Sequence, residues 1–66
     1  MYVVQRRNSD NCQWKTCSLN GKKCRYEYIA EARTAFRRLK HLPENEKIKT
    51  MTFRIIDTKD NDREVE

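Results

Sequence analysis

Glycine, proline and histidine are almost absent from this chain of 66 residues, which has one of each. A single glycine cannot form the glycine-rich loop that cradles phosphates in nucleotide-binding proteins. The lone histidine, His41, has no nucleophile and orienting group near it in the sequence. The carboxylates lie where no buried pocket would shift their pKa values. We therefore expect a protein that is not an enzyme and that uses no cofactor.

Long apolar runs are absent as well. No stretch approaches the roughly 18 apolar residues that a membrane-spanning helix requires. The N-terminal residues Met1–Arg7 lack the layout of a secretion signal. These absences predict a soluble, cytoplasmic protein that does not engage a membrane.

Cysteine is present three times, and an odd number argues against a set of disulfides in a chain without a secretion signal. Zinc could be bound by a Cys3His set, but the spacing lacks the short Cys-x2-Cys knuckle. That set would be Cys12, Cys17, Cys24 and His41. Residues 12 and 17 would also face opposite sides of one strand. We expect no metal site and interpret the thiols as small apolar residues.

Positive charge dominates the composition, since 15 Lys and Arg residues against 10 Asp and Glu residues give a net charge of +5 and a pI near 9.4. The excess lies in residues 1–41, whereas residues 42–66 carry slightly more acidic than basic side chains. Such a surface attracts nucleic acid or an acidic protein surface. The same charge is also within the range that serves solubility alone.

The length of 66 residues is sufficient for a single domain near the lower size limit. We place an α+β domain at residues 1–58 and expect residues 59–66 to form a charged, frayed tail, because they contain almost nothing to bury. The core of such a domain rarely supplies more than about 3–5 kcal/mol of stability. A partner, or a second copy of the chain in a homodimer, is compatible with this small core.

Short strands are predicted in the N-terminal half. Residues 2–7 are rich in residues that favour strands and precede a cluster of turn residues. Residues 12–19 and 22–27 flank Asn20-Gly21, the strongest short signal for a hairpin with a type I′ turn. This half therefore contributes two or three antiparallel strands.

Residues 28–41 have apolar side chains at three- and four-residue steps, which predicts an amphipathic helix. Its start lacks a Ser, Thr, Asp or Asn cap, and Pro43 is expected to end it. A polar connection at residues 44–47 then leads to a last strand at about residues 49–57. This strand is expected to return to the sheet.

The order of elements predicts an α+β fold, ββ(β)αβ, with a three- or four-stranded, mainly antiparallel sheet and one amphipathic helix packed on one face. The helix must cover the sheet because no other element has an apolar stripe to bury. We expect the helix to contact these residues of the sheet: Val3 or Val4, Trp14, Cys17, Phe53 and Ile55.

Basic residues on the predicted helix are the main candidates for partner binding. Arg33, Arg37 and Lys40 form a stripe of like charge, with Arg38 beside it. Like charges at this spacing repel by a few tenths of a kcal/mol, and arginine is suited to bidentate contact with phosphate or carboxylate. A solvated helix face is the alternative interpretation. A second basic cluster lies around the strand edges and the turn, at Arg6, Arg7, Lys22, Lys23 and Arg25.

Aromatic residues lie among these charges, and a sheet with this mixture can stack unpaired bases. They are Tyr2, Trp14, Tyr26 and Tyr28. Trp14 is better explained as a core residue, because a small domain needs the apolar area that it buries. No RNP, helix-turn-helix, KH or zinc-finger pattern is present, so sequence-specific recognition of nucleic acid is not supported.

The layout of the chain has four parts: an opening strand at Met1–Val4, a hairpin with Trp14, a helix segment at Ile29–Arg33 and a returning strand at Phe53–Asp57. This layout, over most of residues 1–57, resembles the small single-domain inhibitors that phages and other mobile elements direct against host machinery, including anti-CRISPR proteins. The resemblance carries no functional residue. It implies an inhibitor that acts in the host cytoplasm by occupying a nucleic-acid channel, an acidic surface or an assembly site.

Together these features predict a non-catalytic protein whose basic face engages an acidic protein surface or a complex that handles nucleic acid. The helix residues and the second basic cluster are expected to make the contact. Direct, sequence-nonspecific binding of DNA or RNA is the alternative.

Overall fold

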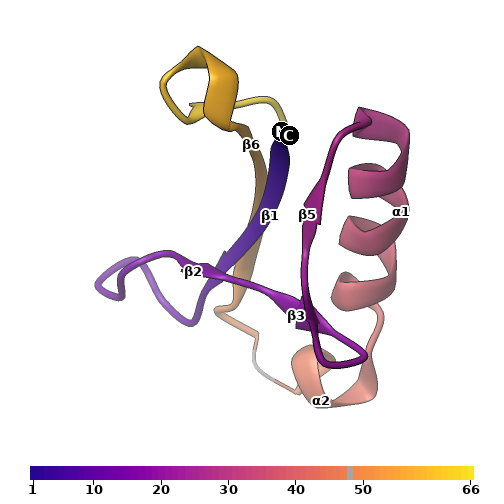
Figure 1. The fold of residues 1–66 in the computed structure, drawn as a ribbon. Coiled ribbons are helices and arrows are strands. Elements are labelled where there is room, and N and C mark those ends of the chain that lie inside the picture. Colours follow the sequence, from indigo (N-terminus) through magenta and orange to yellow (C-terminus); the bar gives the residue numbers. More distant parts are fainter. Residues whose placement is uncertain (48) are drawn as a thin grey trace.

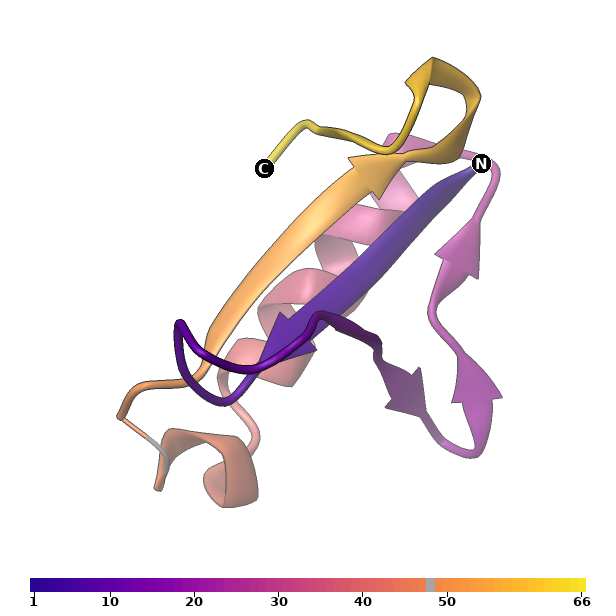
Figure 2. The same ribbon diagram turned by 90° about the vertical axis from the view of Figure 1, so that its left-hand side faces the viewer.

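The computed structural model describes residues 1–47 and 49–66 and shows a sheet with a helix against one face (Figure 1). The strands follow the order β2 (Lys15–Thr16), β1 (Tyr2–Arg7), β6 (Thr52–Asp57) and β7 (Arg63–Glu64), and β5 (Arg25–Tyr26) also pairs with β1. β1 (Tyr2–Arg7) and β6 (Thr52–Asp57) are antiparallel along their whole length, and helix α1 (Ile29–Lys40) lies behind them in Figure 2. The predicted α+β fold, with a mainly antiparallel sheet and one covering helix, is confirmed. In the described part of the chain this sheet has five strands instead of the expected three or four, because the hairpin contributes two separate short strands and the C-terminal segment adds β7.

Alternation along β1 and β6 divides their side chains between the two faces of the sheet. Val4 and Ile55 lie opposite each other, are fully buried and belong to the core that packs against α1. Val3 and Ile56 form the neighbouring pair and are buried on the opposite face. Of the two valines considered from the sequence, Val4 is therefore the one that contacts the helix.

One edge of β1 is occupied by the two arms of a single hairpin. β2 (Lys15–Thr16) pairs with the second half of β1, and β5 (Arg25–Tyr26) pairs with its first two residues. Between these arms, β3 (Ser18–Leu19) and β4 (Lys22–Lys23) leave the sheet and pair with each other. The tip of the hairpin consequently projects beyond the sheet, toward the end of α1 (Figure 1).

The predicted strands 12–19 and 22–27 are shorter in the structure and are interrupted at Cys17 and Cys24. Three backbones meet here in a closed ring of hydrogen bonds. The Val4 N–H donates to the Cys24 carbonyl at 3.0 Å, the Cys17 N–H to the Val4 carbonyl at 2.9 Å, and the Cys24 N–H to the Cys17 carbonyl at 3.0 Å. The hairpin can leave the sheet at this point because each of these buried N–H groups keeps an acceptor.

The hairpin reverses at the Asn20-Gly21 turn. The φ angles of these residues are 53° and 78°, and both are positive as a type I′ turn requires. After the turn, Lys23 is exposed, Cys24 is buried and Tyr26 is half-buried. The turn agrees with the sequence prediction.

Helix α1 begins and ends within one residue of the predicted range 28–41. Its buried residues are Ala32, Ala35 and Leu39, and the two alanines leave room for the helix to lie close to the sheet. Tyr28 occupies the N-cap position without a side-chain hydrogen bond, which matches the missing cap noted in the sequence. No helix in the described part of the chain is long and apolar enough to cross a membrane.

The segment after α1 differs from the polar connection expected at residues 44–47. Pro43 begins a second, short helix, α2 (Pro43–Glu46). Proline is favoured in the first turn of a helix, since its missing N–H would have no acceptor there. The Asn45 Nδ2 donates to the Leu39 carbonyl at 2.8 Å and ties α2 to the end of α1.

After β6 the chain reverses instead of extending into solvent. A single 3-10 turn, η1 (Thr58–Asp60), is followed by Asn61 and Asp62, which both have positive φ. Asparagine and aspartate tolerate this left-handed conformation better than most residues. The reversal lets β7 (Arg63–Glu64) pair with β6.

The C-terminal segment 59–66 therefore differs from the frayed tail expected from its composition. The Val65 N–H donates to the Ile55 carbonyl and the Ile55 N–H to the Glu66 carbonyl, both at 2.8 Å. The Val65 side chain is half-buried and packs against the core. A single apolar residue and backbone pairing are enough to hold this segment on the sheet.

Candidate binding surface

The predicted basic stripe lies on the outer surface of α1. Arg33, Arg37 and Lys40 are exposed and follow one another along the helix. Arg33 forms an ion pair with Glu66. The Lys40 Nζ lies 4.9 Å from the centroid of the half-buried Phe36 ring, so this side chain also covers apolar surface. The stripe is present, but the C-terminal segment partly neutralises its first member.

Arg38 lies on the side of α1 that faces the hairpin. It lines a shallow hollow of about 290 Å³ together with Leu19 and Tyr26. Burial raises the pKa of Tyr26 to about 12; the neighbouring Cys24 adds to the rise and Arg38 opposes it. Arg38 therefore belongs to the surface between helix and hairpin.

The sheet separates the second basic cluster into groups on different faces. Because adjacent strand residues point to opposite faces, Arg6 lies on the helix side and Arg7 on the other side. Arg6, Lys15 and Lys23 line a groove of about 590 Å³ between the hairpin and the end of α1. Lys15 was not among the predicted binding residues. Its position opposite Arg6 follows from strand pairing, which the sequence does not specify.

The two remaining members of this cluster are also apart. Arg25 pairs with Val3 and so lies on the face of the sheet away from α1. Lys22 flanks the turn, opposite Leu19. Of the residues grouped from the sequence, Arg6, Lys22, Lys23 and Arg25 are exposed and Arg7 is half-buried, and they form no single patch.

Trp14 is not a core residue, and the sequence interpretation is corrected here. It is half-buried, and its ring centroid is 4.5 Å from the Arg7 Cζ and 4.2 Å from the Arg54 Cζ. The Arg54 Nε also donates to the Gln5 Oε1 at 2.9 Å. The two planar guanidinium groups lie over the indole ring in cation–π contacts, and these contacts cover part of its apolar area. Arg54 was missed because its role depends on its pairing with Gln5 across the strands.

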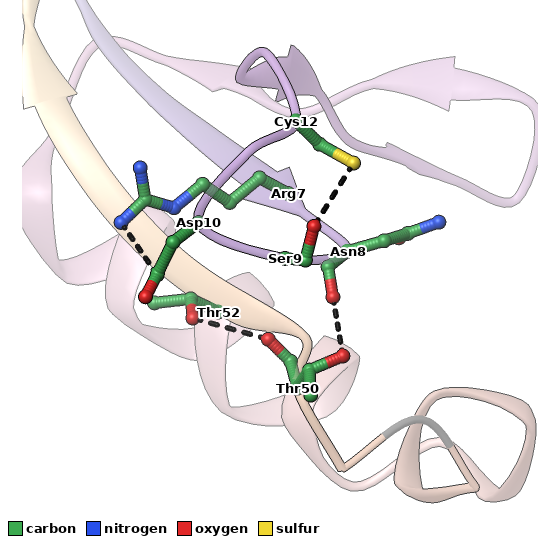
Figure 3. Close-up of polar contacts among 7 residues, drawn as sticks. All are labelled: Arg7, Asn8, Ser9, Asp10, Cys12, Thr50 and Thr52. Atoms are coloured by element: carbon green, nitrogen blue, oxygen red, sulfur yellow. Dashed lines mark hydrogen bonds and ion pairs between the residues drawn. The ribbon is translucent and has the colours of Figure 1, made fainter.

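The loop between β1 and β2 holds Arg7 from another direction (Figure 3). The Arg7 Nη2 donates to the Asp10 Oδ1 at 3.2 Å. The Thr50 Oγ1 donates to the Asn8 carbonyl at 2.5 Å and ties the loop to the segment before β6. Arg7 is therefore held by internal contacts and is less available to a partner than its sequence position suggested.

The cysteines lie in two environments. Cys17 and Cys24 are buried at the base of the hairpin, whereas Cys12 is exposed in the loop, with its Sγ 3.3 Å from the Ser9 Oγ (Figure 3). Burial, and to a smaller extent the nearby Cys24, raises the pKa of Cys17 to about 11. Cys12 lies apart from Cys17 and Cys24 because it belongs to this loop. The sequence had suggested a different reason, namely that residues 12 and 17 face opposite sides of one strand. Among the residues described, no group of three or more Cys, His, Asp or Glu side chains could hold a metal ion.

Most of the predicted binding residues have no internal anionic partner. Arg7 pairs with Asp10, and Arg33 with Glu66. The others are exposed and form no ion pair with a carboxylate within residues 1–47 and 49–66. They are Arg6, Lys22, Lys23, Arg25, Arg37, Arg38 and Lys40.

Comparisons with protein-family models, with curated proteins and with solved structures give no match for this chain. The surface is therefore interpreted from its own geometry. It presents exposed cations on the helix and the hairpin, with apolar side chains between them, and such an arrangement suits contact with a negatively charged surface.

Proposed function

We propose that this protein is a non-catalytic binding protein whose basic surface engages an acidic protein surface, such as that of a complex that handles nucleic acid. The observation that carries the proposal is the set of exposed cations that, among the described residues, form no ion pair with a carboxylate. Their mutual repulsion slightly disfavours the isolated fold, and an acidic partner would remove that repulsion.

The cations occupy two adjoining elements. The last turn of α1 carries Arg37, Arg38 and Lys40, where basic side chains also complement the helix dipole. The hairpin carries Lys22 and Lys23. Side chains of the hairpin and of α1 line common hollows, and Figure 1 shows the two elements side by side. One partner surface can therefore contact both.

Direct, sequence-nonspecific binding of nucleic acid is the second candidate, because the same cations could contact phosphates. The aromatic residues favour the acidic protein. Proteins that bind single strands offer free aromatic rings for base stacking, whereas Trp14 is stacked against Arg7 and Arg54. Among the residues described, Tyr28 is the large aromatic that is exposed, and it lies at the opposite end of α1 from Lys40.

A phage-type inhibitor, for example an anti-CRISPR protein, is one form of this function. Its support is the small α+β domain with a basic surface, together with the layout that resembles such inhibitors. An inhibitor of this kind needs only to occupy an acidic surface or an assembly site. A binding face without catalytic groups is sufficient for that role.

Capture of partners from a cell lysate by the immobilised protein, with and without nuclease treatment, tests the proposal. We expect acidic proteins to be captured from the nuclease-treated lysate and to be released as salt is raised, because salt screens exposed charges. Complete loss of capture after nuclease treatment would contradict the proposal and favour the second candidate.

Titration of DNA and RNA with the purified protein, at about 50 and 200 mM salt, separates the two candidates further. A nucleic-acid binder loses affinity steeply over this range, since phosphate contacts release counterions. For a protein that binds an acidic protein surface, we expect weak binding of DNA and RNA, or none, at the lower salt concentration.

A further inference from the structure

A groove of about 590 Å³ separates the hairpin from the end of α1 and from α2. One side is lined by Arg6 of β1, Lys15 of β2 and Lys23 of β4, which are all exposed. The other side contains Leu39 and Leu42, next to the polar Glu44 and Asn45. The volume of the groove is within the range of known ligand sites, and the groove combines a cationic wall with a partly apolar wall.

Strand pairing concentrates the positive charge of the groove. Arg6 and Lys15 lie directly opposite each other, and like charges in such a pair repel. Lys23 reaches the same groove from the hairpin, and Glu44 lines the opposite side. None of the three cations forms an ion pair with Glu44 or with another carboxylate of the described residues. An external anion can therefore compensate charge that the described part of the chain leaves unpaired.

The apolar wall is held in place by hydrogen bonds in the first turn of α2 and by one bond from α2 to α1. The Leu42 carbonyl accepts from the backbone N–H groups of Asn45 and Glu46, at 2.9 and 3.0 Å. The Leu39 carbonyl accepts from the Asn45 side chain at 2.8 Å. Leu39 is buried and Leu42 is half-buried, so Leu42 is the one that offers apolar surface. A wall that is already ordered reduces the entropy lost on binding.

We propose that this groove docks an extended acidic segment of the partner protein, with carboxylates on Arg6, Lys15 and Lys23 and an apolar side chain against Leu42. The inference rests on the proposed function and specifies the chemistry of the contacting segment. The lining runs along β2 and the hairpin on one side and from α1 to α2 on the other, which suits an extended chain. The apolar wall favours a peptide over a phosphate backbone, which has no apolar side chain to place there.

Fluorescence anisotropy with a labelled oligoglutamate peptide that carries one central leucine tests the groove. The exposed positions allow Arg6→Ala, Lys15→Ala and Lys23→Ala to fold, which circular dichroism verifies. Each should weaken binding about tenfold, the loss expected for one charge-assisted contact. Lys59→Ala is the matched control, because it removes the same charge from an exposed position in η1 that does not line the groove; it should change affinity by less than about twofold. Replacing the leucine of the peptide by serine should weaken binding about fivefold.

Absence of peptide binding by the unmodified protein, or equal affinity of Arg6→Ala, Lys23→Ala and Lys59→Ala, would overturn the groove proposal. Tighter binding of an oligonucleotide of equal charge, with the same dependence on Arg6 and Lys23, would also overturn it and assign the groove to phosphates. Lysate capture distinguishes this failure from failure of the proposed function. If Arg6→Ala and Lys23→Ala still capture the acidic proteins after nuclease treatment, the function stands and the groove proposal does not.

Discussion

Val4, Cys17 and Cys24 form the junction at which the hairpin leaves the sheet. Their backbones close a ring of three hydrogen bonds, and their side chains are buried in the same core. Cysteine suits these two positions because its small thiol fills apolar space without requiring a strong hydrogen-bond partner. At Cys17 the burial favours the neutral thiol and raises its pKa, since a buried thiolate would lack compensating solvation.

Alkaline pH should therefore destabilise the fold through Cys17. Its pKa rises from an ordinary 9.0 to about 11 on folding, so the folded state holds the proton more tightly than the unfolded chain. The resulting stability is complete below pH 9 and is lost as the pH rises toward 11. We expect the free energy of unfolding, measured by urea denaturation, to fall by about 2 kcal/mol over this interval.

The variant Cys17→Ala isolates this contribution. It should remove the part of the pH dependence due to Cys17 and retain the part due to Tyr26, whose pKa is raised to about 12. An identical decline of stability in Cys17→Ala and in the unmodified protein would contradict the assignment.

The fluorescence of Trp14 provides a second test of side-chain packing, because the environment of the indole depends on Arg7 and Arg54. Arg54→Ala should expose the indole, shift its fluorescence to longer wavelength and lower the free energy of unfolding by about 1 kcal/mol. Arg54→Lys should have a similar effect on the emission, since lysine lacks the planar group that packs on the ring. Arg37→Ala, which removes an exposed arginine elsewhere, should leave the emission unchanged. A core position for Trp14 would instead leave the emission of Arg54→Ala unaltered.

Among the elements, those that depend on local sequence patterns were predicted correctly. β1 follows from its strand-forming residues, the turn from Asn20-Gly21 and α1 from the spacing of its apolar residues. The breaks at Cys17 and Cys24 could not be predicted, because they depend on hydrogen bonds to Val4, which is distant in the sequence.

The C-terminal strand β7 was missed for a similar reason. Its composition is that of an exposed tail, and its position depends on backbone bonds of Val65 and Glu66 to Ile55. α2 was missed because Pro43 ends one helical pattern and also begins the next. From a sequence pattern, the end of a helix before a proline is easier to predict than the start of a new helix at that proline.

The candidate surface was predicted better as a set of residue types than as an arrangement in space. Helical spacing correctly placed Arg33 and Arg37 along one side of α1. Strand parity alone would have separated Arg6 from Arg7, but the pairing of Arg6 with Lys15 requires knowledge of the register. The groove could therefore not be predicted from the sequence.

The close packing of α1 on the sheet predicts that a larger side chain on the buried face of the helix destabilises the fold. Ala32 is fully buried in the core, whereas Ala30 in the same helix is exposed. Ala32→Leu should lower the free energy of unfolding by about 1–3 kcal/mol, because the added atoms cannot be accommodated without displacing the helix. Ala30→Leu makes the same chemical change at the surface and should alter stability by less than about 0.5 kcal/mol. Equal thermal shifts for the two variants would show that the buried face of α1 is wrongly assigned.

The molecule has its main apolar core between sheet and helix, and the sequence carries a net charge of +5. Within residues 1–47 and 49–66, the ion pairs lie mainly in the loop after β1 and in the C-terminal half, such as Arg7 with Asp10 and Arg63 with Asp60. The outer side of α1 and the hairpin keep positive charge that these pairs do not neutralise. This uneven distribution, more than the net charge, is the basis of the proposed function.

The most direct test of that function is capture of acidic proteins from nuclease-treated lysate by charge-reversed variants. Arg37→Glu/Lys40→Glu reverses two exposed cations of α1, and Lys49→Glu/Lys59→Glu makes the same change of net charge at exposed positions outside α1 and the hairpin. We expect the first double variant to lose the captured proteins and the second to retain them at the level of the unmodified protein. Equal capture by both variants, or equal loss in both, would contradict it, because binding would then not depend on the surface of α1.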